Sequence, residues 1–481
     1  MSASVREKAF TQRFYLYLIM TKSAEKLYMS YAVKNSEGAA LMPSYIIRSM
    51  RKMFSHCLKL SYKDTAQQNS YVTIPRAANS FDNTEIAANV DEDIIDSLTG
   101  GRLVGSVTSF ENFAECPLRY YLRYGVDLKE REEFTFSPVN FGVVLHAVIR
   151  EVCDEIKKNG ESYYLISEEK RREMVKRSVA AITDIYQNSI LKDSSRNSFM
   201  IKRMEDLADR TVWAMGEQLK CGDFVPFVFE HKFNMEVGDG DRKQLMSGTI
   251  DRVDICENGT DVYVRIIDYK TGKKDFNIVK TYYGIDIQLM VYMEAAMKLV
   301  AKMRPGKNVI PAGVFYYNIS DPIVSATTES AEEIEDKIKG ELRLKGMVNS
   351  DKDIAEKMDN TEGTSLNIPV SRKADGGFDS RRSKVMNTEQ FNILGRFVDV
   401  RAIDTADRIA GGDIRRSPYK DGQFSSCDRC PYGAVCGFSV DLPGCNYRKL
   451  KKFDDEVLWN NIKEGVDENG KKMDTGAEER D

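Results

Sequence analysis

The sequence has few histidines and no long apolar stretch. Only three of its 481 residues are histidine, so a site that uses an imidazole has few candidates. No run of 18 apolar residues is present, and the first residues contain no apolar core of a signal peptide. These absences argue against a membrane span and against secretion. We therefore expect a cytoplasmic protein without a membrane partner.

The chain also lacks a phosphate-binding loop and a strong net charge. No Gly-x-x-x-x-Gly-Lys-Ser/Thr sequence occurs, so we expect no ATPase motor in this chain. The formal net charge of −4 gives no whole-chain attraction to nucleic acid, which leaves any DNA contact to local patches. With 42% hydrophobic residues, the chain is long enough for two or three domains with real cores.

The apolar spacing predicts a mixed sheet flanked by helices. Helical patterns cover residues 141–158, 167–221, 284–303 and 388–410, and strand patterns cover residues 224–236, 246–256, 262–269 and 309–318. Asn258-Gly259 between the second and third strand patterns is a strong hairpin signal. The order helix, three strands, helix, strand indicates an α/β or α+β core. The stretch 346–386 is polar, and we expect the charged segment from Arg448 onward to end as a frayed tail.

Two acids and a lysine stand out on the predicted strands. Asp251 and Asp268 lie on consecutive strands, and Lys270 follows the second acid at i+2. Alternate residues of a strand face the same way, so Asp268 and Lys270 point together. Hydrolysis of a phosphodiester needs carboxylates that hold a divalent metal and a cation beside the attacking water. The alternative for Asp251 is an edge strand with solvated acids.

Four further residues are candidates for the same site. His146, in Gly142-x-x-x-His146, is a competent metal ligand, although a hydrogen-bonded histidine in a helix interface is the alternative. Gln288 and Tyr292 share one helix face and could contact a nucleic-acid backbone or orient the lysine. Glu230, on the preceding strand, is a further candidate carboxylate.

Four motifs in order carry a resemblance to a known family. Gly-x-x-x-His, Gly-x-x-Asp-Arg-x-Asp, Asp-Tyr-Lys-Thr-Gly and Tyr-Tyr-Gly-Ile-Asp-Ile-Gln-x-x-x-Tyr resemble the RecB-type branch of the PD-(D/E)XK nucleases, which have a restriction-endonuclease-like core. The resemblance implies that Mg²⁺ is held by His146, Asp251, Asp268 and the Tyr269 carbonyl. It also implies that Lys270 orients or activates water and stabilises charge, and that Gln288 and Tyr292 support substrate binding. The implied catalytic set is Asp251, Asp268, Lys270, Gln288 and Tyr292.

The cysteines indicate a metal site rather than disulfides. The chain has nine cysteines, an odd number, and no secretion signal, which argues against a disulfide framework. Cys427-x-x-Cys430-x5-Cys436 has ligand spacing, and taken alone it suits zinc at least as well as iron–sulfur. Together with Cys116 it resembles the four cysteines of AddB-type subunits of helicase–nucleases, which hold a 4Fe–4S cluster. Such a cluster would close a loop of 310 intervening residues, so a structural role is expected.

The N-terminal segment carries a weaker resemblance. Residues 17–27 resemble motif VI of superfamily 1 helicases, with Lys22 in place of the usual arginine. Lysine cannot reproduce the bidentate contact of a guanidinium with phosphate. AddB-type subunits are similar, because their helicase-like body does not serve as the motor. The alternative is that residues 8–60 form only a short α/β segment.

Together these patterns predict four parts of the chain. They are a remnant of an inactive helicase-like domain (1–60), a linker (61–105), an α/β PD-(D/E)XK nuclease domain clasped by a 4Fe–4S cluster (106–445) and a charged tail (446–481). The last part begins where the pattern of apolar residues ends.

The resemblance also implies a function. It is that of a Mg²⁺-dependent DNA exonuclease that processes double-strand breaks for recombinational repair. Such an enzyme would cut the 5′-ended single strand from unwound duplex ends, as a heterodimer with an AddA-like helicase/nuclease subunit. The alternatives are a nuclease-dead DNA-binding scaffold, a stand-alone iron–sulfur exonuclease of the CRISPR-associated type and a structural zinc protein.

Overall fold

A computed structural model describes most of the chain. The described residues are 5–22, 29, 31, 41–42, 44–53, 89–91, 94, 104–129, 138–185, 195–237, 244–325, 330–440 and 445–478. The chain divides into two compact units, Met1–Phe81 and Asp82–Asp481. Most of the expected linker and residues 23–27 of the helicase-like motif lie outside the described residues. No helix in the described ranges has both the length and the apolarity of a bilayer span.

The described elements of the first unit are two helices. These are α1 (Val5–Thr21) and α2 (Tyr45–Met53). The Thr21 hydroxyl donates to the carbonyl oxygen of Tyr17 at 2.9 Å, within the last turn of α1. Lys22, the residue that follows, is exposed.

A seven-stranded mixed sheet forms the centre of the second unit. Its strands are β1 (Val104–Ser106), β2 (Val225–Val237), β3 (Gln244–Asn258), β4 (Asp261–Lys270), β5 (Asn308–Asn318), β6 (Lys345–Asn349) and β7 (Val385–Met386). β2, β3 and β4 are antiparallel neighbours, whereas β5 runs parallel to β4. The turn between β3 and β4 contains Gly259 at φ +60°, a conformation that glycine adopts without strain. The expected hairpin is therefore confirmed.

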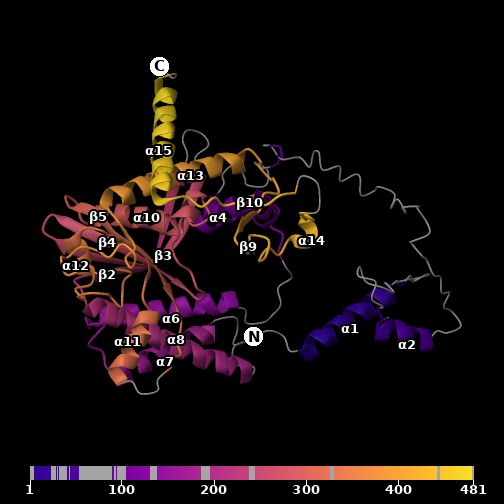
Figure 1. Ribbon diagram of the computed structural model, residues 1–481. Coiled ribbons are helices and arrows are strands. Elements are labelled where there is room, and N and C mark those ends of the chain that lie inside the picture. The colour runs from indigo at the N-terminus through magenta and orange to yellow at the C-terminus, as the bar shows by residue number, and fades with distance from the viewer. Residues whose placement is uncertain are drawn as a thin grey trace. The chain divides into compact units, whose positions relative to one another are not determined.

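Helices cover both faces of this sheet (Figure 1). One layer contains α6 (Pro138–Lys158), α7 (Glu168–Ile185), α8 (Ser195–Lys220) and α11 (Ala331–Glu341), and the other contains α4 (Val107–Glu115), α10 (Gln288–Met303), α13 (Thr388–Ala410) and α15 (Asp455–Glu478). Along β4, Tyr263 and Ile267 pack in the first core, while Val264 and Ile266 pack in the second. This is the two-residue period of a strand buried on both faces. The predicted mixed sheet flanked by helices is confirmed.

The remaining elements are short and lie around the two layers. They are α5 (Pro117–Tyr120), the π-helical turn η2 (Tyr121–Gly125), α9 (Ile278–Tyr282), α12 (Lys352–Met358), β8 (Tyr419–Asp421), β9 (Phe424–Ser425), α14 (Gly433–Cys436) and β10 (Arg448–Lys449). β10, β8 and β9 form a separate three-stranded sheet.

The structure differs from the expectation in two places, and it adds detail at a third. The stretch 346–386 contains most of β6, together with α12 and β7, which are too short to give a clear period. The pattern over 167–221 corresponds to two helices, α7 and α8. The charged segment after Arg448 begins with an ordered part, because Leu458 and Ile462 of α15 are buried in the second core. These two apolar residues, four apart, are enough to dock a helix that is otherwise charged.

Candidate active site

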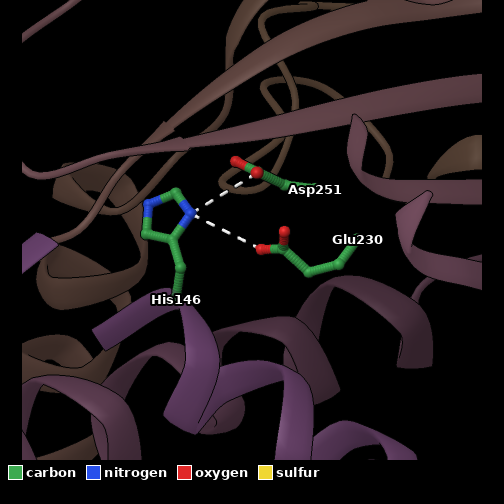
Figure 2. A group of neighbouring side chains, drawn as sticks. All are labelled: His146, Glu230 and Asp251. Carbon is green, nitrogen blue, oxygen red and sulfur yellow. Dashed lines mark ion pairs between the residues drawn. The ribbon is translucent and has the colours of Figure 1, made fainter. Parts of the chain in front are cut away.

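Acidic side chains from two strands meet a histidine from α6. His146 lies on α6, Glu230 on β2 and Asp251 on β3, and Figure 2 shows the imidazole directed at both carboxylates. Nδ1 of His146 is 3.4 Å from Oδ1 of Asp251 and 3.8 Å from Oε1 of Glu230. Within the described parts of the chain, no other three His, Cys, Asp or Glu side chains bring their ligand atoms within 4.8 Å of one another.

The backbone of β2 is irregular at this cluster. Glu230 has φ +48°, a left-handed conformation that is unusual for a residue with a side chain. On the neighbouring strand, Ile250 and Val253 pack in the same core although residues three apart in a regular strand face opposite sides. The two irregularities coincide, because Glu230 and Asp251 are the unpaired residues between the register pairs Phe229–Arg252 and His231–Ile250. They bring both carboxylates to His146, and strained backbone of this kind is common at functional sites.

Asp268 and Lys270 lie beside this cluster, on the sheet face that α10 covers. Lys270 Nζ is 2.5 Å from Oδ2 of Asp268. That oxygen is buried, and no hydrogen bond of regular geometry reaches it from the described residues. Burial and the nearby negative charge of Asp251 raise the pKa of Asp268 to about 6, while Lys270 opposes the rise. Asp251 and Asp268 are therefore close enough to repel each other.

Gln288 and Tyr292 position Lys270 through a chain of hydrogen bonds. Oε1 of Gln288 accepts a hydrogen bond from Lys270 Nζ at 2.9 Å, and its Nε2 donates to the Tyr292 hydroxyl at 2.9 Å. The side chains of Gln288 and Tyr292 are buried, and the tyrosine ring packs edge-on against Phe233. Because both are buried, the arrangement favours orientation of the lysine over direct contact with a nucleic-acid backbone.

The backbone of Tyr269 holds Asp251, and a buried ion network lies next to it on β3. The backbone N–H of Tyr269 donates to Oδ2 of Asp251 at 2.6 Å, so that the other oxygen faces the imidazole. Next along β3, Arg252 donates to both oxygens of Asp254 at 2.7 and 2.6 Å. Arg265 of β4 donates to the same carboxylate at 2.8 Å. The Asp-Arg-x-Asp spacing thus combines one site carboxylate with a buried link between two strands.

The charge state of His146 depends on these carboxylates. Burial alone would lower the pKa of His146, but Asp251 and Glu230, which accept its hydrogen bonds, outweigh burial and raise it to about 10. The imidazole is therefore protonated at neutral pH in the metal-free protein. A metal ion that binds His146 has to displace this proton.

A second group of charged residues lies next to Lys270, and the sequence analysis did not predict it. Glu111 of α4 accepts hydrogen bonds from the backbone N–H groups of Ile287 and Gln288 at 2.9 and 3.0 Å. Lys274 lies 3.0 Å from Asp286. Asp286 belongs to the last motif quoted above, and Lys274 follows the Asp-Tyr-Lys-Thr-Gly motif by two residues. No spacing in the sequence connects Glu111 with a helix 176 positions later.

The four clustered cysteines converge although 310 residues separate the first from the second. Burial raises the pKa of Cys116, Cys427 and Cys436, and the negative charges of neighbouring thiolates in the set, including Cys430, raise it further. All four are free thiols. Cys445 is buried and lies outside this set.

Taken together, a mixed sheet between two helix layers and a carboxylate–lysine site on its central strands define a nuclease-type α/β protein. The model of the PD-(D/E)XK nuclease superfamily matches residues 105–437, and the chain belongs to this superfamily.

More particularly, the chain is similar to the B subunits of ATP-dependent helicase/deoxyribonucleases. The relative from Caldanaerobacter subterraneus subsp. tengcongensis is 31% identical over 99% of this chain and 46% of its own length. Those from Clostridium acetobutylicum and Lachnoclostridium phytofermentans are each 30% identical, over 98% and 100% of this chain and 45% of their own lengths. The resemblance to AddB-type subunits is thus confirmed, and the chain spans slightly less than half the length of these relatives.

Proposed function

We propose that this chain is a metal-dependent deoxyribonuclease that hydrolyses the phosphodiester bonds of single-stranded DNA. The observation that carries the proposal is the meeting of His146, Glu230 and Asp251 beside the Asp268–Lys270 pair. One side of the site holds ligands for a cation and the other holds a positive charge. This combination suits the charge of a phosphodiester and of its transition state.

The donor set fits a divalent cation such as Mg²⁺. Ligands at about 2.1 Å from an octahedral ion lie roughly 3.0 to 4.2 Å apart, and the distances of 3.4 and 3.8 Å from His146 fall in this range. Asp268 adds a buried oxygen without a regular hydrogen bond. His146, Glu230, Asp251 and Asp268, with the Tyr269 carbonyl, would hold the ion. When bound, it would supply Lewis acidity and lower the pKa of a water ligand.

The protein's own residues would position the reacting groups. Lys270 would place its ammonium against the negative charge that develops on the phosphoryl oxygens, and Gln288 would keep it in that position. Tyr292 would fix the orientation of the Gln288 amide, so that its oxygen rather than its nitrogen faces Lys270. These groups are preorganised, because all three side chains are already connected by hydrogen bonds.

The four cysteines would hold a 4Fe–4S cluster that clasps the two ends of the domain. A zinc tetrahedron with bonds of 2.3 Å would place its sulfur atoms about 3.8 Å apart. No three of these thiols, all within the described residues, lie within 4.8 Å of one another. The similarity of the chain to helicase/deoxyribonuclease B subunits, whose cysteine pattern it resembles, supports an iron–sulfur cluster over zinc. Burial raises the pKa of the Cys116 thiol, and the backbone N–H groups of Arg119, Ser417 and Leu118, whose hydrogen bonds the sulfur accepts, oppose the rise.

The similarity to helicase/deoxyribonuclease B subunits supports a place in a larger assembly. In it, an AddA-like helicase/nuclease subunit would supply the motor and this chain would cut the 5′-ended strand during processing of double-strand breaks. The same similarity supports an inactive helicase-like segment at residues 1–60, a linker at 61–105 and the nuclease domain at 106–445.

The test is Mg²⁺-dependent degradation of end-labelled single-stranded DNA by the anaerobically purified chain. Wild type is compared with Asp268→Ala and with the control Asp223→Ala. Asp223 precedes β2, and its exposed carboxylate pairs with Lys357. We expect cleavage by wild type and Asp223→Ala, and a loss of at least about 100-fold in Asp268→Ala with DNA binding retained. A folded wild type that binds but never cleaves DNA would instead support a DNA-binding scaffold.

A further inference from the structure

Helix α10 begins without a cap of its own. Its N-cap residue is Ile287, whose side chain makes no capping hydrogen bond. The first N–H groups of a helix need acceptors, which the N-cap side chain usually supplies. Here Glu111 supplies the acceptor from α4, because one carboxylate oxygen accepts from both Ile287 and Gln288.

Glu111 binds the backbone of Gln288, and Gln288 in turn positions Lys270. The backbone N–H of Gln288 bonds to Glu111, and the side chain of Gln288 bonds to Lys270 and Tyr292. A shift of the first turn of α10 would move the amide oxygen away from the lysine ammonium. Two contacts therefore connect Glu111 to the lysine, although Glu111 touches neither Lys270 nor the His146 cluster in any hydrogen bond or ion pair found for it.

The surroundings of Glu111 keep it in place. Burial raises the pKa of Glu111 to about 7, which the nearby Lys274 opposes and Asp286 reinforces. Lys274 in turn is paired with Asp286 and lies over the buried Tyr316 ring. The carboxyl group therefore lies among fixed neighbours rather than in solvent.

We propose that Glu111 is a positioning residue of the nuclease site, which sets the place of Lys270 through the first turn of α10 and Gln288. The proposal rests on the nuclease function proposed above. Glu111 acts on the lysine and not on the metal ligands. Its loss should therefore lower the rate of the chemical step and leave the binding of DNA nearly unchanged.

The experiment measures kcat and KM for Mg²⁺-dependent cleavage of single-stranded DNA by the full chain. We expect Glu111→Ala to lower kcat by about 10- to 100-fold with KM within about twofold, since misplacement of a catalytic group by about 1 Å has effects of this size. Glu111→Gln keeps an oxygen that accepts both N–H groups and should retain most of the activity. If Glu111→Ala does not fold, Glu111→Asp withdraws the carboxylate by one methylene and carries the same expectation.

The matched control is Asp351→Ala. Asp351 also caps a helix with its carboxylate, because it accepts from the N–H groups of Asp353 and Ile354 at the start of α12. It follows β6, which β5 separates from the site strand β4. Asp351→Ala should lower thermal stability, as the loss of a helix cap does, and leave kcat unchanged. An equal loss of kcat in both variants would reduce Glu111 to a structural cap and overturn the proposal.

A double variant separates action through Gln288 from an independent effect. If Glu111 works through Gln288, Glu111→Ala combined with Gln288→Ala should lose no more activity than Gln288→Ala alone. Multiplied losses would overturn the proposal. A wild type without any cleavage would overturn the nuclease function itself and this inference with it, whereas an active wild type with an unaffected Glu111→Ala variant would overturn the inference alone.

Discussion

Asp254→Asn should destabilise the fold far more than the loss of a surface charge does. Asp254 is at the centre of a buried network, since it accepts two hydrogen bonds from Arg252 and one from Arg265. All three side chains are at most 1% exposed. Asparagine keeps the shape of the side chain, but it removes the negative charge and leaves only one atom that can accept. Two buried guanidinium groups then lose their counter-charge.

The expected magnitude follows from this geometry. Removal of one partner from a buried ion pair costs about 3–5 kcal/mol, because the remaining charge stays desolvated. This is a large share of the free energy of unfolding of a typical protein, which is roughly 5–15 kcal/mol. The control is Asp223→Asn, because that carboxylate is 64% exposed and lies 3.3 Å from Lys357. Exposed pairs of this kind contribute about 0–1 kcal/mol.

The assay is urea unfolding of wild type and both variants, followed by circular dichroism. Burial alone would raise the pKa of Asp254, but Arg252 and Arg265 outweigh it and lower the pKa. A carboxyl group with a lowered folded pKa stabilises the fold above its unfolded pKa of about 3.9 and loses that contribution as the pH falls through the folded value. The gap between wild type and Asp254→Asn should therefore be constant from about pH 8 to 5 and close only below about pH 4. A loss under about 1 kcal/mol, equal to that of Asp223→Asn, would refute the reasoning.

Two further predictions concern the metal sites. The pKa of His146 is about 10, so metal binding has to displace a proton, and the affinity for Mn²⁺ or Mg²⁺ should rise about tenfold per pH unit between roughly pH 7 and 9. Calorimetric titration should show a flatter dependence of affinity on pH for His146→Gln. An equal slope in both proteins would contradict the assignment of His146 as a ligand. Cys430→Ser should lose most of the roughly four iron atoms per chain and lower the temperature of thermal unfolding, whereas Cys445→Ala should keep the iron. Zinc in place of iron in the wild type would refute the cluster.

The sequence predicts the central sheet well, for reasons that are local. The sequences of β3 and β4 contain alternating or continuous apolar residues, and Asn258-Gly259 marks the turn between them. Each strand and its neighbour can therefore be recognised within about 25 residues. The Asp268–Lys270 pair follows from the same two-residue period. Since these features depend only on neighbours along the chain, one sequence is sufficient to predict them.

Glu111 and Glu230 show what local patterns cannot supply. The contact of Glu111 with α10 joins residues 176 positions apart, and only the packing of α4 beside the sheet brings them together. Glu230 lies on a strand with the expected range, but its left-handed backbone breaks the alternation that predicts the direction of its side chain. The position of a residue on a strand therefore did not determine the direction of its side chain.

The break in alternation turns Asp251 away from the direction that the β3–β4 register predicts for it. Asp268 faces α10 with Lys270, whereas Asp251 faces His146 on α6, so the two acids belong to opposite helix layers. They still meet, because the N–H of Tyr269, the residue after Asp268, holds Asp251 at the irregular point of β3. In a regular continuation of the β3–β4 register, Asp251 would lie opposite Asp268 and face α10 as well. The irregularity therefore directs Asp251 toward His146, while the N–H of Tyr269 keeps the same carboxylate near Asp268.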